Sequence, residues 1–220
     1  MSISTENFVK AIYKQTQVSG GDTKPGTLAK LLSITNAATT DMARKLAAKK
    51  LVNYTKYKEL TLTTEGEKMA LNVLRKHRLW ETFLHKTLNL SLHEIHREAE
   101  MLEHLTSDFL AEKISNYVGN PEYDPHGDPI PNMHGIITDR HNTILLSQAR
   151  EHTDYKITRL FSSDEDFFNF CKENNLMIGM DVRVVKQYES NKMTEIAVNN
   201  KHVLLNADFT NVIYVKPVLT

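Results

Sequence analysis

The stretch TNAATTDMARKLAAKKLV, residues 35–52, decides the fold of the N-terminal part of the chain. Thr35 or Asn36 can cap a helix that starts here, because either side chain accepts a hydrogen bond from one of the first backbone N–H groups. Met42, Leu46 and Leu51 follow on the inner side of that helix. The stretch therefore predicts a short amphipathic helix with one side in a core and the other toward solvent.

Two helices are predicted before this stretch. Residues 6–15, ENFVKAIYKQ, place Phe8 and Ile12 on one apolar side, and residues 23–34, TKPGTLAKLLSI, form a second short helix after a Gly-Gly-Asp turn. The turn at about residues 33–36 gives the last two helices helix-turn-helix spacing.

A small hairpin is predicted after it. Residues 53–63, NYTKYKELTLT, alternate as a hairpin does, with the tip at residues 56–59. Three helices and a hairpin predict a winged helix-turn-helix, which we assign to residues 1–62. These residues carry ten Lys or Arg against four Asp or Glu, although the formal net charge of the whole chain is zero. The positive surplus predicts a polyanion-binding module.

Three further segments follow along the chain. Residues 63–88 predict one long helix and residues 92–118 a second, so we assign residues 63–120 to a helical domain. Residues 121–153 are assigned to a Pro- and Gly-rich linker. Residues 154–220 change to a period of two, which predicts a small β-barrel and a fold that is mainly α with a small β domain. The expected strands are YKITRLF, DVRVVKQY, TEIAVNN, HVLLN and NVIYVKP, with a helix at DEDFFNFCKENN.

The composition excludes several classes of protein. The chain is 40% hydrophobic and 25% charged, as in ordinary globular proteins. Its single cysteine, Cys171, excludes a disulfide framework and a multi-cysteine zinc site. The N-terminus lacks a signal-peptide pattern, and no apolar run approaches the roughly 18 residues of a membrane span. We therefore expect a cytoplasmic protein with no membrane partner.

The stretch HREAEMLEH, residues 96–104, predicts a ligand set. On a continuous helix, His96, Glu100, Glu103 and His104 fall within an arc of about 100° at the edge of the apolar face. A solvated charged face would lie opposite the core, so these four residues are candidate metal ligands. The apolar face is expected to hold Leu92, Ile95, Ala99, Leu102 and Phe109.

The preceding helix repeats the pattern. His77 and Glu81 share a face with Leu74, Leu84 and Leu88. Burying an unpaired carboxylate costs several kcal/mol, and a bound divalent cation removes that cost. The alternative is a pair of ordinary helix salt bridges, His77–Glu81 and Glu100–His104, each worth about 0.3–0.5 kcal/mol. Six such residues at core edges on two successive helices favour a metal.

The ligand types narrow the choice of metal. Carboxylate oxygen and imidazole nitrogen without thiolate favour Mn²⁺ or Fe²⁺ for a regulated site. The Irving–Williams order still allows Zn²⁺, Co²⁺ or Ni²⁺ to bind in vitro.

Several motifs together resemble the diphtheria toxin repressor family of metal-dependent regulators. They are SITNAATTDMARKLAAKKLV, TLTTEGEKMA, RKHRLWETFL, HREAEMLEHLTSD and GNPEYDPHGDPIPN, within residues 5–132, and the C-terminal region is more loosely similar to the family's SH3-like domain. The resemblance implies a homodimeric repressor that binds palindromic operator DNA when it is loaded with Fe²⁺ or Mn²⁺ and that controls metal-uptake genes.

The resemblance also implies two metal sites. His77, Glu81 and His96 match the family's ancillary site, whereas Glu100, Glu103 and His104 match its primary, activating site. Iron-sensing members typically have cysteine where this chain has Glu100, and manganese-sensing members have glutamate. Replacing soft sulfur by hard oxygen favours Mn²⁺.

Two positions depart from the family's pattern. The first helix of the family supplies a ligand at the position of Asn7, usually methionine or aspartate, and asparagine is a neutral, weaker ligand. The position of Lys10 is a carboxylate in some manganese sensors, where it helps to hold a second ion, and lysine cannot do so. In some members the barrel lends ligands from the region of Arg159 and Ser162, for which Asp164 or Glu165 are candidates here.

The predicted mechanism is allosteric, with metal tying the first helix to the dimerisation helices and fixing the spacing of two recognition helices. Predicted DNA contacts open the recognition helix or neutralise phosphates from it and from the wing. They are Thr35, Asn36, Ala37, Thr39, Thr40, Arg44, Lys45, Lys49, Lys56 and Lys58.

Three alternative functions fit the sequence less well. A di-metal carboxylate enzyme would need ligands from four long helices, and ligand-bearing helices are predicted only within residues 63–118. A metalloprotease is disfavoured because HExxH is missing and the inverted motif fails at Glu100. A winged-helix regulator that senses something other than metal would leave the buried ligands unexplained.

Overall fold

The structure is a computed structural model that describes residues 2–18, 21–56, 58–138, 142–162 and 164–218. Residue 57 at the predicted hairpin tip and residues 139–141 of the predicted linker lie outside these ranges. The described chain forms two compact units. The first comprises residues 1–80, 99–117 and 130–137, and the second residues 81–98, 118–129 and 138–220.

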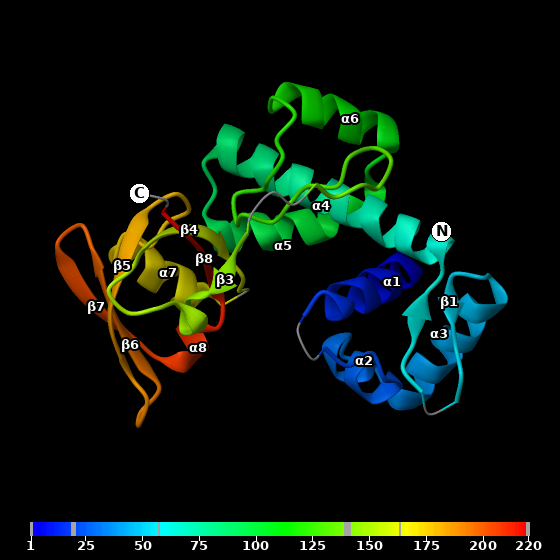
Figure 1. Cartoon of the computed structure of the whole chain (residues 1–220). Coiled ribbons are helices and arrows are strands. Elements are labelled where there is room, and N and C mark those ends of the chain that lie inside the picture. Colours follow the sequence, from blue (N-terminus) through cyan, green and yellow to red (C-terminus); the bar gives the residue numbers. More distant parts are fainter. Residues whose placement is uncertain (1, 19–20, 57, 139–141, 163, 219–220) are drawn as a thin grey trace. The chain divides into compact units, whose positions relative to one another are not determined.

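The first unit begins with the predicted winged helix (Figure 1). Thr35 is the cap of the recognition helix, because its hydroxyl accepts the Ala38 N–H at 3.1 Å. The predicted hairpin is present as a short antiparallel pair in which Val52 lies opposite Leu62. Phe8, Ile12 and the neighbouring apolar side chains form the core of this region. The elements are α1 (Ile3–Thr16), α2 (Pro25–Leu31), α3 (Asn36–Ala48), β1 (Val52–Asn53) and β2 (Thr61–Leu62).

Three further α-helices follow, and one prediction about them is wrong. The first is α4 (Thr64–Leu88), as expected. The single helix expected at residues 92–118 is instead divided into α5 (Leu92–Leu102), the 3-10 turn η1 (Glu103–Leu105) and α6 (Asp108–Tyr117). Thus Glu103 and His104 lie on a turn, and their positions do not follow α-helical angles.

The interruption has a local cause. Thr106 is extended, with ψ at 120°, and its hydroxyl donates to the Leu102 carbonyl at 2.7 Å. Ser107 then starts α6 by accepting the Leu110 N–H at 3.1 Å. Because of the break, Phe109 does not lie on the apolar face expected for it and is 72% exposed. Leu88, at the end of α4, was also expected on an apolar face and is exposed.

The second unit contains a six-stranded sheet in the order β3-β8-β4-β5-β6-β7, with antiparallel neighbours. Of the five expected strands, residues 181–188 match the observed bounds, and the other four differ from them by one or two residues at their ends. Strand β3 was not predicted. The sheet is consistent with an SH3-like domain, which confirms the predicted fold class. Its strands are β3 (Ile144–Leu145), β4 (Asp154–Leu160), β5 (Asp181–Tyr188), β6 (Met193–Val198), β7 (Lys201–Leu205) and β8 (Ile213–Pro217), with η2 (Leu146–Gln148), α7 (Glu165–Glu173) and α8 (Ala207–Thr210).

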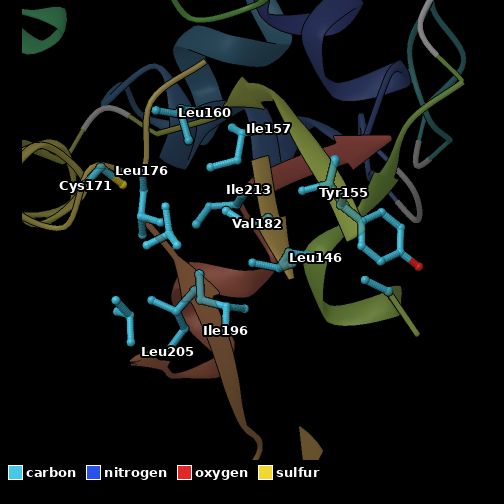
Figure 2. Close-up of a cluster of buried hydrophobic side chains, with 14 of the residues drawn as sticks. Leu146, Tyr155, Ile157, Leu160, Cys171, Leu176, Val182, Ile196, Leu205 and Ile213 are labelled. Atoms are coloured by element: carbon cyan, nitrogen blue, oxygen red, sulfur yellow. The ribbon is translucent and has the colours of Figure 1, made fainter. Parts of the chain in front are cut away.

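Alternate residues of the strands fill one apolar core. Figure 2 shows Ile157, Val182, Ile196 and Ile213 directed into the same cluster, and each is at most 2% exposed. Cys171 of α7 joins this cluster, and burial raises the pKa of its thiol to about 12. The cysteine is therefore a small apolar core residue here. None of the helices within the described residues could span a membrane.

Candidate metal centres

Most of the predicted ligands in the first unit meet in one group, which we name the helix cluster. Helix α1 contributes from one side, and α4, α5 and η1 contribute from the other. Several of the contacts join residues about ninety positions apart in the sequence, so the cluster connects the winged helix to the segment near residue 100. Its contacting members are Glu6, Lys10, His77, Glu100, Glu103 and His104, and we group Asn7 with them because it lies next to Glu6 on α1.

Two atoms in the helix cluster are of ligand type and lack hydrogen-bond partners. The Oδ1 atom of Asn7 and the Nε2 atom of His104 are buried, and neither makes a hydrogen bond within the described residues. The other ring nitrogen of His104, Nδ1, lies 2.6 Å from Oε2 of Glu6. That contact orients the ring and directs Nε2 toward Oε1 of Glu103, 3.1 Å away, so these two ligand-type atoms are placed to share a cation. The donor set therefore fits a divalent metal ion.

Glu103 is the centre of the cluster. Its side chain is 0% exposed, its Oε2 lies 2.7 Å from Nδ1 of His77, and its Oε1 lies 2.5 Å from Nζ of Lys10. The turn that carries Glu103 is held by Thr106, whose hydroxyl accepts the Trp80 indole N–H at 2.7 Å. A buried carboxylate is stable here because several polar groups compensate for its lost hydration.

Glu100 lies at the more open side of the cluster. Burial alone would raise the pKa of its carboxyl, but the charges of Lys10, His77 and Lys14 and a hydrogen bond from Lys10 hold the pKa below its usual range. The carboxylate therefore stays ionised at neutral pH, which is the form that binds a cation.

A second group lies in the second unit, and we name it the loop cluster: Glu81, His96 and His126. Oε1 of Glu81 lies 3.0 Å from Nδ1 of His96 and 3.4 Å from Nε2 of His126. One ligand atom from each residue can be chosen so that all three lie within 4.8 Å of one another. Neither ring nitrogen of His126 has a hydrogen-bond partner within the part of the chain described. Two imidazoles and a carboxylate in this arrangement also fit a transition metal.

The loop at residues 124–128 positions His126. Oδ1 of Asp124 accepts the backbone N–H groups of His126 and Asp128, each at 2.9 Å, and closes the loop. The His126 carbonyl accepts the Leu160 N–H at 2.9 Å, which ties the loop to β4. Gly127 has a φ of +85°, and a Cβ there would lie 2.0 Å from the Thr158 carbonyl oxygen. Only glycine allows this close approach.

His126 was not among the sequence-predicted ligands. Residues 119–135 read as loop, and helical spacing says nothing about a loop residue. The available signal was a histidine between two aspartates in a Pro- and Gly-rich segment, DPHGD. Burial alone would lower the pKa of His126, but the Glu81 carboxylate, with added effects of Asp124 and Asp128, raises it.

The predicted ligands are thus divided between the two clusters. His77 lies beside Glu103 in the helix cluster, whereas Glu81 and His96 lie together in the loop cluster. The barrel candidates have other contacts. Asp164 caps α7 by accepting the Asp166 N–H at 3.0 Å, and Oε2 of Glu165 lies 3.7 Å from Nε2 of His93.

The predicted DNA-reading residues lie on α3 and the hairpin. Thr35, Asn36 and Ala37 are exposed at the start of α3, and Thr40 is half-buried. Thr39 differs, because its side chain is 0% exposed and its hydroxyl donates to the Thr35 carbonyl at 3.0 Å. We therefore leave it out of the proposed contacts. The basic residues are all exposed: Arg44, Lys45, Lys49, Lys56 and Lys58.

Two family profiles match the chain. Residues 1–60 match the iron dependent repressor N-terminal DNA binding domain, and residues 63–132 match the iron dependent repressor metal binding and dimerisation domain. Both describe parts of repressors, and neither supports the alternative of a di-metal enzyme.

Individual relatives agree with the profiles. An uncharacterized HTH-type transcriptional regulator of Methanocaldococcus jannaschii is 36% identical over 118 residues, which cover 54% of this chain and 94% of that protein. The diphtheria toxin repressor of Corynebacterium efficiens is 22% identical over 84% of each chain. A solved structure of a manganese-dependent transcriptional repressor in complex with manganese has a TM-score of 0.91 and 29% identity, covering 97% of this chain and 100% of the other.

Proposed function

The chain belongs to the iron dependent repressor family, the family of the diphtheria toxin repressor, and we propose that it represses transcription by binding palindromic operator DNA as a homodimer when a divalent cation is bound. Its site of action is the cytoplasm, and its targets are genes of metal uptake. The domain boundaries that we propose are residues 1–62, 63–120, 121–153 and 154–220.

One observation carries the proposal. The helix cluster joins α1, a core element of the winged helix, to α5 and η1. Phe8 and Ile12 on α1 are 1% and 0% exposed in the winged-helix core, so α1 cannot shift without displacing the helices packed on it. A change in the cluster therefore acts on the recognition helix α3.

The residues of this chain fit a divalent cation in the helix cluster. Asn7, Glu100, Glu103 and His104 would hold it, and Glu6 would orient the His104 ring. A cation bound there would supply positive charge that offsets the carboxylates and would accept the lone pairs of Asn7 Oδ1 and His104 Nε2. The loop cluster of Glu81, His96 and His126 is the proposed second site.

We propose Mn²⁺ as the regulatory metal, with Fe²⁺ as the second choice. The donors are carboxylate and imidazole groups in both clusters, with the Asn7 amide added in the helix cluster. Hard oxygen donors suit Mn²⁺ better than they suit the metals that prefer thiolate. Zn²⁺, Co²⁺ and Ni²⁺ are expected to bind in vitro, because the Irving–Williams order favours them at any nitrogen- and oxygen-donor site.

The mechanism requires no chemical step. Glu6 and Lys10 on α1 hold that helix against Glu100, Glu103 and His104. In a homodimer this contact fixes the spacing and tilt of the two recognition helices, which must match two half-sites of an operator. Linkage then requires that DNA and metal each tighten the binding of the other by the same factor.

The proposed DNA contacts divide into two kinds. Thr35, Asn36, Ala37 and Thr40 open the recognition helix, where side chains meet base edges and phosphates. The exposed cations of α3 and the wing neutralise phosphates and make the affinity fall steeply with salt. They are Arg44, Lys45, Lys49, Lys56 and Lys58.

An apolar surface supports the homodimer. Leu105 and Phe109 are 83% and 72% exposed, and Met101, Leu110 and Tyr117 nearby along the chain are exposed as well. Monomeric proteins rarely expose this many large apolar side chains on consecutive elements. A second copy of the chain would cover them, consistent with the metal binding and dimerisation profile over residues 63–132.

The deciding experiment is DNA binding measured by fluorescence anisotropy. The probe is a palindromic duplex selected from a random library by the Mn²⁺-loaded full chain, and the control is a shuffled duplex of equal length. We expect Mn²⁺ to tighten binding to the selected duplex by about 5- to 150-fold relative to chelator. Equal affinity with Mn²⁺ and with chelator would contradict metal-dependent repression.

A second experiment tests the ligands. Glu100→Ala and Asn7→Ala are each expected to abolish the Mn²⁺-dependent part of DNA binding, because each removes an oxygen donor from the helix cluster. Glu98→Ala, at a neighbouring position on α5 where the glutamate pairs with exposed Arg97, is the matched control. If Asn7→Ala keeps full Mn²⁺ activation, Asn7 is not a ligand.

A further inference from the structure

The hydroxyl of Thr106 connects α4 to the end of α5. The indole N–H of Trp80 on α4 donates to Oγ1 of Thr106 at 2.7 Å, and the same hydroxyl donates to the carbonyl of Leu102, the last residue of α5, at 2.7 Å. An indole nitrogen is a donor only, so the hydroxyl must accept from it and direct its own proton to Leu102. Because Thr106 is only 5% exposed, water has little access to either bond.

These two hydrogen bonds enclose the turn η1. Leu102 and Thr106 are the residues directly before and after Glu103–Leu105. The last carbonyls of an α-helix have no partner within the helix, and here the Leu102 carbonyl accepts the Thr106 hydroxyl. Thr106 is extended, with φ at −83° and ψ at 120°, so α5 does not continue through it. One side chain therefore holds both ends of η1, and Trp80 holds that side chain to α4.

Two of the proposed metal ligands lie on this turn. Nε2 of His104 lies 3.1 Å from Oε1 of Glu103. Consecutive residues of a helix do not face each other, so this close approach depends on the backbone of the turn that carries both residues. His77 and Glu6 orient the outer atoms of the two side chains, at 2.7 Å and 2.6 Å. Those contacts join side chains only, and the backbone of the turn is held by Thr106.

From this arrangement we propose that Thr106, held by Trp80, is a positioning residue of the helix cluster, which keeps η1 in the shape that lets Glu103 and His104 share one cation. The inference rests on the proposed function, because it takes the helix cluster to be the activating metal site. Thr106 supplies no ligand itself. A turn that is ordered before the metal binds need not be ordered by the metal, so loss of the hydroxyl should weaken metal binding.

The test is the Mn²⁺ affinity of the full chain without DNA, measured by isothermal titration calorimetry. The parent for all variants is Glu81→Gln, which removes a ligand from the loop cluster. Thr106→Val replaces the hydroxyl by a methyl group of similar size and removes both hydrogen bonds. We expect the Mn²⁺ affinity to fall by about 10- to 100-fold, the usual effect of losing a group that orients a metal ligand. Thr106→Ser keeps the hydroxyl and should restore most of the affinity.

Thr39→Val in the same parent is the matched control. Thr39 is also buried, and its hydroxyl also donates to the carbonyl four residues earlier, that of Thr35, at 3.0 Å. It lies on α3, which contributes no residue to the helix cluster. We expect both valine variants to lower the free energy of unfolding in urea, and Thr106→Val alone to lower the Mn²⁺ affinity. Lower stability of Thr106→Val with unchanged Mn²⁺ affinity would overturn the proposal.

Trp80→Phe tests the second bond, and it also serves where Thr106→Val fails to fold. It removes the indole N–H and leaves the bond from Thr106 to Leu102, so the Mn²⁺ affinity should fall by about 2- to 10-fold. In the Thr106→Val chain the same change should have no further effect, because its partner is already absent. Unchanged affinity in folded Trp80→Phe would overturn the proposal. A parent chain that binds no Mn²⁺ would overturn the helix cluster as a metal site and this proposal with it, so the two failures are distinct.

Discussion

The helix cluster and the loop cluster use the same kinds of ligand but compensate their buried charge in different ways. In the helix cluster, Lys10 supplies a positive charge to Glu100 and Glu103. In the loop cluster, Glu81 instead faces two imidazoles, His96 and His126. A cluster with its own cation can hold its helices together before metal binds, whereas a cluster of imidazoles depends on a proton or a metal. The helix cluster therefore suits regulation of α1, and the loop cluster suits a contact that forms only when a proton or a metal is bound.

The largest effect is expected from Glu103→Ala in the helix cluster. The change removes a partner of Lys10 and of His77 at a site that is 0% exposed. Removing one partner of a buried ion pair costs about 3–5 kcal/mol, so the free energy of unfolding should fall by about that amount. Urea unfolding of the metal-free protein measures it. Glu98→Ala is the control, and its free energy of unfolding should change by less than about 0.5 kcal/mol. Equal changes in both variants would show that the helix cluster does not stabilise the protein.

Gly127→Ala should disrupt the loop cluster by moving His126. The new Cβ would meet the Thr158 carbonyl at 2.0 Å in a residue with φ at +85°. A non-glycine residue held at positive φ costs about 1–3 kcal/mol before the clash is counted. We expect lower stability and the loss of one bound Mn²⁺ per chain. Gly179→Ala, with φ at +87° and nothing within 4 Å of its Cβ, has the backbone cost alone and should keep the ion.

His126→Gln separates the two clusters without a backbone change. It removes one of three ligands from the loop cluster, and we expect the Mn²⁺ count to fall by one while the helix cluster keeps its ion. Isothermal titration calorimetry with Mn²⁺ distinguishes the loss of the loop-cluster ion from the loss of the helix-cluster ion. A variant that still binds the same number of ions would exclude His126 from the ligand set.

The smallest effect is a pH dependence confined to the loop cluster. Burial lowers the pKa of His126, but Glu81, Asp124 and Asp128 together raise it above 6.5. A protonated imidazole cannot bind metal, so Mn²⁺ affinity at the loop cluster should fall as the pH drops through this raised pKa, by about tenfold per pH unit at most. Without metal the sign is reversed: protonated His126 contributes stability below pH 6.5, and this contribution is lost as the pH rises through the raised pKa. The effect is measured by Mn²⁺ titrations of a His104→Gln variant, in which the helix cluster has lost a ligand. Equal Mn²⁺ affinity of the loop cluster at pH 8 and pH 6 would contradict the prediction.

The winged helix and the sheet were predictable because local signals are strong there. Thr35 as an N-cap and the alternation at residues 181–188 each specify structure within a few residues. The candidate ligands were selected by an equally local signal, since a carboxylate or imidazole at the edge of an apolar helix face is rare, and they remain a prediction.

The arrangement of the ligands could not be predicted in the same way. Thr106 and Ser107 interrupt the helix expected at residues 92–118, so Glu103 and His104 lie on η1. The available sequence signal for this interruption was Thr-Ser-Asp at residues 106–108. Lys10 and His126 enter their clusters through contacts with residues 93 and 45 positions away, which no local period reports.

The most direct test of the central claim is reciprocal linkage between DNA and the helix cluster. Mn²⁺ is titrated into the Glu81→Gln full chain, free and in complex with its selected palindromic duplex. The account predicts that the duplex tightens Mn²⁺ binding by the same factor by which Mn²⁺ tightens duplex binding. Equal Mn²⁺ affinity in the free protein and in the complex would contradict the claim that the helix cluster controls the recognition helix.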